Sequence, residues 1–175
     1  MSRRINRGFY ILQKGLINIK NLIISTIPET DSKFPDAETL YLADYKFGNC
    51  IGCTNCWLKT PGICAVKDDW AVIFGKILKA DNIILVTEAK LGFISYKMKN
   101  LIDRLIPIAT PYTKLYKGEM RHKPRYDKCW NFGLVYSGDG NEEFLREWME
   151  RFVLNLYCKS LGVYTLEESE GLKLW

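Results

Sequence analysis

Four of the six cysteines in the chain lie within a stretch of fifteen residues. Cys50, Cys53, Cys56 and Cys64 have the spacing C-x2-C-x2-C-x7-C, with a Pro-Gly turn inside the last interval. A pair of acids, residues 68–69, follows at a position suited to open a helix. In a reducing compartment, cysteines clustered in this way indicate metal binding or redox chemistry more than disulfides.

Length and charge limit the classes of protein to consider. The chain has 175 residues, 47% of them hydrophobic, which suits one domain with a core of its own. We divide it into an N-terminal arm, residues 1–17, and a single domain, residues 18–175. The net charge of +5 equals the five basic residues that precede the first acid, Glu29. The remaining 20 basic and 20 acidic residues balance, so the charge does not favour a nucleic-acid partner.

The sequence also gives no sign of a membrane partner. No apolar run approaches the roughly 18 residues that a membrane-spanning helix needs. Polar residues interrupt the apolar positions of the first twenty residues, which therefore lack a signal-peptide pattern. We expect a cytoplasmic location.

Alternating apolar strands and amphipathic helices predict an α/β domain. About ten residues separate the first two predicted strands, which is short for a helical crossover in a parallel sheet, so we predict that the first crossover helix is missing. The long connection over residues 107–128 is expected to be functional or to form an interface, and Cys129 and Cys158 are expected to pack in the core. The predicted elements are strands over 19–27, 38–45, 81–87, 129–136 and 162–166, helices over 68–80, 95–107 and 142–160, and loops over 88–94 and 137–141.

Several segments carry a resemblance to a known family. The cysteine loop reads C-x-G-C-x-x-C-W-x-K-T-P-G-x-C from Cys50 to Cys64. Further matching segments are Asp68-Asp69, Leu91-Gly92-Phe93-Ile94-Ser95, Lys99, Asp103-Arg104-Leu105-Ile106-Pro107, Pro111-Tyr112, Gly118-Glu119, His122 and Arg125-Tyr126. On these residues the chain resembles the flavodoxin-like NAD(P)H-dependent FMN reductases, in a branch similar to the iron-sulfur flavoproteins. The resemblance implies a flavodoxin-like open parallel sheet of about five strands with helices on both faces.

The resemblance also implies an FMN site at the carboxyl ends of the strands. The chain departs from the family in the first loop, where Ser25-Thr26-Ile27-Pro28 replaces a Gly-Ser phosphate loop and the helix that follows it. That helix N-terminus would be a ready-made anion site. The implied FMN-binding residues are Ser25, Thr26, Thr87, Glu88, Ala89, Lys90, Leu91, Gly92, Phe93, Ser95, Ser137, Gly138, Asp139 and Gly140.

The cysteine loop has three interpretations. Iron-sulfur flavoproteins bind a [4Fe-4S] cluster through a compact motif of this kind, which would make Cys50, Cys53, Cys56 and Cys64 the ligands. Four thiolates also suit a structural zinc site, although paired C-x2-C units are more typical of zinc. In the flavin-only branch of the family, similar cysteines pack beside the flavin without a metal.

These observations lead to two functional hypotheses. The first is an FMN-dependent oxidoreductase that passes electrons from NAD(P)H to a small acceptor or a redox partner, directly or through a [4Fe-4S] cluster. The cofactor would do the chemistry, and we assign no catalytic residue. The alternative is a flavodoxin-like binding or assembly module that has lost the flavin. In either case we expect a homo-oligomer, with residues 107–128 as a candidate contact.

Overall fold

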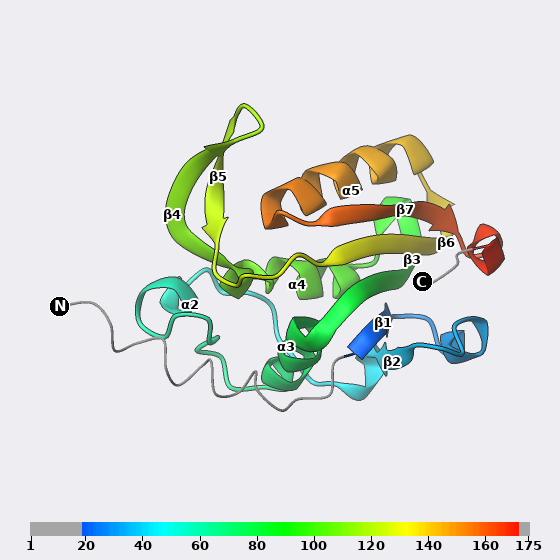
Figure 1. Cartoon of the computed structure of the whole chain (residues 1–175). Helices are drawn as coiled ribbons and strands as arrows, with labels where there is room; N and C mark the ends of the chain where they lie inside the picture. Colours follow the sequence, from blue (N-terminus) through cyan, green and yellow to red (C-terminus); the bar gives the residue numbers. More distant parts are fainter. Residues whose placement is uncertain (1–18, 172–175) are drawn as a thin grey trace.

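The computed structural model describes residues 19–171. The predicted N-terminal arm, residues 1–17, lies outside the described residues. Five parallel strands form the main sheet in the order β2-β1-β3-β6-β7 (Figure 1). The strands are β1 (Ile19–Ser25), β2 (Glu38–Tyr41), β3 (Ala80–Ile94), β6 (Asn131–Gly140) and β7 (Lys159–Thr165). This is the strand order of a flavodoxin-like fold, and the predicted class of fold is confirmed.

A 3-10 helix, η1 (Thr30–Lys33), stands where the first crossover helix is normally found. It follows directly on Glu29, which has a left-handed backbone conformation. The segment between β1 and β2 is too short for a helix that spans the sheet and returns. The missing first crossover helix is therefore as predicted, and β2 ends at Tyr41, where a further 3-10 helix, η2 (Leu42–Asp44), begins.

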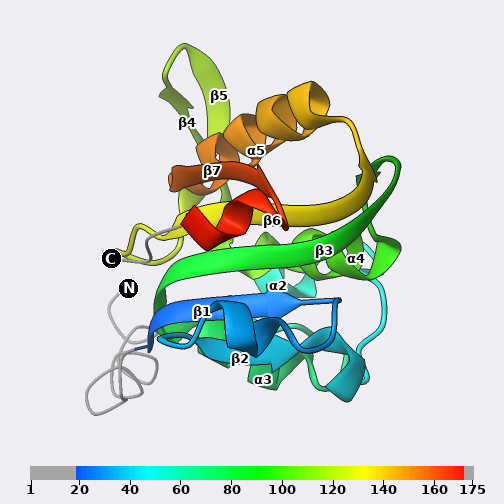
Figure 2. The same cartoon turned by 90° about the vertical axis from the view of Figure 1, so that its right-hand side faces the viewer.

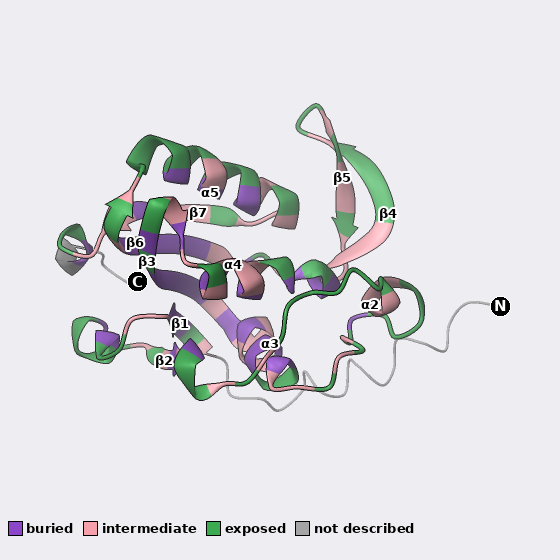
Figure 3. Cartoon of the chain, turned by 180° about the vertical axis from the view of Figure 1, so that it is seen from behind, coloured by how far each residue is buried: buried purple, intermediate pink, exposed green. Residues whose placement is uncertain are grey.

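The three longest helices cover one face of the sheet. They are α3 (Trp70–Lys79), α4 (Tyr96–Asp103) and α5 (Glu142–Leu156), and their buried residues share one core with the sheet (Figure 3). The opposite face has a smaller core in which Ile23, Ile84, Val86 and Val135 pack with Phe34, the residue after η1. Figure 2 views this second face, with η4 (Glu168–Gly171) in front of the strands. The two faces therefore differ: α-helices cover the first face, whereas no α-helix among the described residues covers the second.

The strands β3 and β6 are longer than the sequence predicts. The segments 88–94 and 137–140, expected as loops, continue these two strands and pair with each other. Figure 2 shows the two strands running on together beyond the end of β1. The apolar pattern ends where this extension leaves the core, so the pattern alone indicates a loop there.

A β-hairpin occupies most of the long connection between α4 and β6. Its strands are β4 (Ala109–Tyr116) and β5 (Glu119–Pro124), which pair antiparallel through a turn at Lys117-Gly118. The hairpin stands away from the main sheet and exposes much of its surface (Figures 1 and 3). The 3-10 helix η3 (Ile106–Ile108) directly precedes the hairpin in sequence. The one-turn helix α2 (Asn55–Leu58), from the cysteine loop, packs near η3 and β4. The sequence gives the length of this connection but not the pairing within it.

Candidate functional site: a four-cysteine cavity and the strand-end rim

The cysteine loop is held against the segment that joins α4 to the hairpin. The indole Nε1 of Trp57, in α2, donates a hydrogen bond to the carbonyl of Ile106 at 3.0 Å. Arg125, just after β5, donates from Nε to the carbonyl of Pro107 at 3.0 Å and from its terminal nitrogen to that of Cys56 at 3.4 Å. These contacts tie a loop with little regular structure to two other parts of the chain.

A glycine makes the close approach of Arg125 possible. Gly62, in the Pro-Gly turn, has a φ of +83°, in the left-handed region that favours glycine. A Cβ at this position would lie 3.1 Å from the hydroxyl of Tyr126 and 3.2 Å from Cδ of Arg125. The turn and the Arg125-Tyr126 segment therefore fit together, although some sixty residues of sequence separate them.

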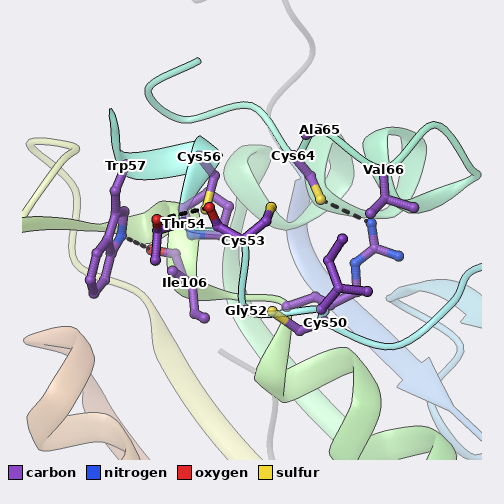
Figure 4. A pocket seen from close by; sticks show the side chains of 13 residues that line it. Cys50, Gly52, Cys53, Thr54, Cys56, Trp57, Cys64, Ala65, Val66 and Ile106 are labelled. Atoms are coloured by element: carbon purple, nitrogen blue, oxygen red, sulfur yellow. Dashed lines mark hydrogen bonds between the residues drawn. The ribbon is translucent and has the colours of Figure 1, made fainter. Parts of the chain in front are cut away.

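The four cysteines of the motif line one cavity of about 60 Å³ (Figure 4). Cys50 and Cys53 are exposed, while Cys56 and Cys64 are half-buried. The rest of the wall comes from the loop itself, from Arg104 at the end of α4, and from η3. The four cysteines are therefore close in sequence and also line the same cavity.

The cysteines affect one another's charge in this cavity. Burial raises the pKa of the Cys56 thiol, and the neighbouring Cys64, Cys50 and Cys53 raise it further. Four thiolates gathered here would repel one another unless a cationic group neutralised them. The donor set is thus suited to an iron-sulfur cluster, for which four thiolates are the usual ligands. In the part of the chain that the structure describes, no three His, Cys, Asp or Glu side chains come close enough together to hold a single metal ion.

Arg104, which lines the cavity, is held in an ion pair with Asp68. Arg104 is 2% exposed, and its guanidinium donates to both carboxylate oxygens of Asp68, at 2.5 and 3.1 Å. A third hydrogen bond, of 3.2 Å, goes from Arg104 to Sγ of Cys64 and is drawn as a dashed line in Figure 4. Burial acts to raise the pKa of Asp68, but Arg104 and the backbone N–H groups of Gly48 and Trp70 outweigh it and lower that pKa. Asp68 is therefore held as a carboxylate against Arg104, which itself contacts Cys64.

The sequence does not predict this role of Asp68 and Arg104. The acids at 68–69 are expected to start a helix, and Asp69 is indeed the residue before α3, but its side chain makes no capping bond there. Instead Asp69 accepts from the backbone N–H of Lys46 at 2.7 Å, and Asp68 accepts from that of Gly48 at 3.0 Å. Both acids close the loop on itself. The signal available in the sequence was the presence of Asp68 and Arg104 among the family-matching segments.

At the carboxyl ends of the strands, hydroxyl groups from three segments meet. The hydroxyl of Thr87 lies 2.8 Å from that of Ser95 and 3.2 Å from that of Thr26. Ser25 donates to the carbonyl of Ile27 at 2.7 Å, and the backbone N–H of Thr26 is bonded to Val86. The structure therefore brings these predicted residues together, with their polar groups already engaged within the chain.

The other predicted flavin-binding residues form the paired extension of β3 and β6. Ala89 lies opposite Gly138, and Gly92 lies opposite Gly140, which leaves Lys90 and Leu91 as a bulge. Gly138 comes so close to β3 that a Cβ there would be 2.8 Å from the Ala89 carbonyl oxygen. We call residues 88–92 and 137–140 the rim. Glu88, Lys90, Leu91, Gly138 and Asp139 are exposed on it, Leu91 almost completely (96%).

Two predicted positions, Phe93 and Cys129, differ from what the sequence indicates. Phe93 turns away from the rim and packs in edge contacts with Phe144 and Trp148 of α5. Cys158 packs against the core as expected, but Cys129 is exposed, because β6 begins only two residues after it. The apolar pattern that predicts this strand begins before the paired strand does, so it does not show that Cys129 lies outside the core.

Helix α4 links the hydroxyl cluster of Thr26, Thr87 and Ser95, which adjoins the rim, to the cavity. Its N-cap, Ser95, takes part in the hydroxyl cluster and accepts from the Met98 N–H, while Arg104 follows its last turn. Eight residues of α-helix span about 12 Å. The two candidate cofactor sites are thus positioned by one rigid element.

Comparison with proteins of known structure agrees with this architecture. RosB with its bound intermediate 8-demethyl-8-formylriboflavin-5'-phosphate superposes with a TM-score of 0.56 at 14% identity, over 83% of this chain and 64% of that one. A flavone reductase gives 0.52 at 16% identity (85% and 54%), and the azoreductase AzrA gives 0.51 at 12% identity (86% and 91%). The chain has a flavodoxin-like fold.

Sequence comparison relates this flavodoxin-like protein to archaeal iron-sulfur flavoproteins. One from Methanocaldococcus jannaschii is 38% identical over 73 residues, which cover 42% of this chain and 37% of that protein. One from Archaeoglobus fulgidus is 41% identical over 69 residues (39% and 33%), and another from the same organism is 23% identical over 135 residues (77% and 55%). The chain thus matches between about a third and a half of the length of these relatives. No protein-family model matches it.

The predicted resemblance to flavodoxin-like FMN reductases and iron-sulfur flavoproteins is confirmed. As for membranes, the helices within residues 19–171 are all too short or too polar to cross a bilayer.

Proposed function

We propose that this protein is an FMN-dependent oxidoreductase that carries a [4Fe-4S] cluster and passes electrons from NAD(P)H to a small acceptor or a redox partner. The observation that carries the proposal is the cavity lined by Cys50, Cys53, Cys56 and Cys64. The sequence relationship to proteins named iron-sulfur flavoproteins supports it.

The cavity residues fit a cluster by charge as well as by ligand type. A [4Fe-4S] cluster supplies one-electron transfer when it is bound by four thiolates. The half-buried Cys56 and Cys64 would hold its inner side, and the exposed Cys50 and Cys53 would close the outer side. Arg104 lines the cavity and is held there by its ion pair with Asp68.

The rim is the candidate flavin site. FMN would supply hydride acceptance from NAD(P)H and release of single electrons. Gly138 and Gly92 add no side chain to the rim, and the exposed Lys90 adds a cation to it. Ser25 and Thr26 do not fit the phosphate as they stand, because their hydroxyls donate within the chain. We therefore propose no phosphate contact at these two residues.

A second copy of the chain is the proposed partner, with the hairpin as the contact surface. Tyr112 and Leu115 are each 70% exposed and Met120 is 65% exposed. The cysteine loop adds Ile51 and Leu58, at 70% and 67%. Exposed apolar side chains gathered on neighbouring segments are typical of a protein interface.

Anaerobic purification and reconstitution test the two cofactors separately. With iron and sulfide supplied, we expect about four iron atoms per chain and a broad brown absorbance. With FMN supplied, we expect bound flavin after gel filtration and oxidation of NADH or NADPH in the presence of an acceptor. Failure of the wild-type chain to retain iron and sulfide would contradict the cluster, and failure to retain FMN would contradict the flavin.

Thiol labelling supplies an internal control for the cluster. In the reconstituted protein, the four cysteines of the motif should be protected from an alkylating reagent. The exposed Cys129 should react at the same rate with and without the cluster. Equal protection of Cys129 would show that the reagent is merely excluded, and unprotected motif cysteines would contradict the assignment.

Two observations favour a second candidate, a binding or assembly module without a flavin. The first crossover is the 3-10 helix η1 rather than an α-helix, and the hydroxyls of Thr26, Thr87 and Ser95 are engaged with one another. A protein that stays colourless after both reconstitutions, yet forms a defined oligomer, would support this candidate.

A further inference from the structure

Arg104 is the most deeply buried cation beside the cysteine cavity. Only 1% of its side chain is exposed, compared with 14% for the Asp68 side chain that it pairs with. One terminal nitrogen donates to the Gly48 carbonyl at 2.9 Å and to Asp68 at 2.5 Å. The other donates to Cys64 Sγ at 3.2 Å and to Asp68 at 3.1 Å. The guanidinium also lies over the Trp70 ring, 5.1 Å from its centre.

The Nε–H group of this side chain has no hydrogen-bond partner. The atom is buried, and none of the residues that the structure describes accepts from it. A buried donor without an acceptor costs free energy, about 1–3 kcal/mol, and more when the group is charged. Arg104 lines the cavity itself, so a group bound there would be near this donor. The wall of the cavity therefore includes a fixed positive charge whose side chain has one unused donor.

We propose that Arg104 is a positioning residue that sets the reduction potential of the cluster. The inference rests on the proposed function, because it concerns the same four-cysteine site. A [4Fe-4S] core with four thiolates is anionic and gains one more negative charge when it takes up an electron. Hydrogen bonds to the sulfur ligands and nearby positive charge stabilise that added charge. The Arg104 bond to Cys64 thus favours the reduced state and makes the potential less negative.

Asp68 has the opposite effect on the potential in this arrangement. Its carboxylate holds the guanidinium in place through two hydrogen bonds, but its negative charge partly cancels the positive charge of Arg104. Removing the charge of Arg104 should therefore shift the potential to more negative values. Removing the charge of Asp68 while keeping Arg104 should shift it to less negative values. A role in folding alone would not give shifts of opposite sign.

The experiment compares four variants after anaerobic reconstitution with iron and sulfide. They are Arg104→Gln, Arg104→Lys, Asp68→Asn and, as a matched control, Arg146→Gln, which removes an exposed guanidinium from α5. Iron and acid-labile sulfide give the degree of loading. A redox titration followed by the EPR signal of the reduced cluster gives the potential. We expect a more negative potential in both Arg104 variants, a less negative one in Asp68→Asn, and the wild-type value in Arg146→Gln.

The outcomes separate this inference from the proposed function. A wild-type chain that takes up no iron and sulfide overturns both. A loaded wild type and a loaded Arg104→Gln with the same potential overturn only the role of Arg104. If Arg104→Gln does not fold or load, Arg104→Lys decides in its place, since it keeps the charge but loses the planar set of donors. Shifts of the same sign in Arg104→Lys and Asp68→Asn would overturn the inference.

Discussion

The indole of Trp57 lies against the imidazole of His122, with ring centres 4.7 Å apart. The contact joins α2, in the cysteine loop, to β5 of the hairpin. Trp57 also borders two hollows, the cysteine cavity and a neighbouring groove of about 640 Å³ that His122 lines. The residues that line both hollows are Cys50, Gly52, Trp57 and Ile106. Changes in the hairpin are therefore expected to affect the cysteines.

Replacing Trp57 tests this connection. Trp57→Phe keeps a ring against His122 but removes the donor to Ile106, at a cost of about 1 kcal/mol in the free energy of unfolding. Trp57→Ala removes the ring contact as well, for a further cost of about 1 kcal/mol. Urea unfolding of the metal-free protein gives both values, and the alkylation rate of Cys56 should rise in the same order. Leu58→Ala, at a 67% exposed neighbour, is the control and should change neither.

Replacing Gly62 by alanine should destabilise the loop, whereas the same change at Gly48 should not. The φ of +83° at Gly62 costs a residue with a Cβ about 1–2 kcal/mol, and the new methyl group would press on Arg125 and Tyr126. At Gly48 a Cβ would meet nothing within 4 Å. Thermal or urea unfolding of the two variants measures the difference. Equal stability of the two would show that the turn adapts and that the fit with Arg125 is not needed.

The hairpin is attached to α5 by an ion pair with a defined pH dependence. Arg151 donates to both oxygens of Glu119 at 2.7 and 2.9 Å, and this bond, aided by Arg121, lowers the pKa of Glu119 to about 2. Because the folded-state pKa lies below the ordinary value of 4.5, the contribution to stability is complete above that value. It is lost as the pH falls from there through about 2.

Glu119→Gln removes this contribution. The melting temperature of the variant should lie below that of the wild type at neutral pH, and the gap should close as the pH falls to about 2. Glu143→Gln, on the exposed first turn of α5, serves as the control. A gap that stays constant over the whole range would mean that the carboxylate charge of Glu119 does not stabilise the fold.

Polar substitutions on the hairpin test the proposed contact between copies. We expect Leu115→Ser combined with Met120→Ser to shift the mass measured by light scattering toward that of a single chain, since both side chains are mostly exposed on β4 and β5. Val72→Ser, at a 53% exposed position on α3, should leave the assembly unchanged. An oligomer that persists in the double variant would place the contact elsewhere.

The sequence predicts the regular part of the fold well, because apolar periodicity reports burial. The strand cores of β1, β3 and β6 and the helices α3 and α4 lie where it places them. The hairpin was missed because its strands are half-exposed and carry many charges, so they lack the apolar alternation of a buried strand. The rim was expected as two loops because its residues are also largely exposed and lack that apolar alternation.

The cysteine spacing, the short first crossover and the order of elements can be read from the sequence alone, since each of these is a property of neighbouring residues. Folding is needed to bring Arg104 to the sulfur of Cys64, forty residues earlier, and to place Asp68 where it holds that arginine. Folding also brings Trp57 against His122 and the hydroxyl of Thr87 against that of Ser95. These contacts depend on how separate elements pack, and a residue's type and local spacing do not record its partner across the fold.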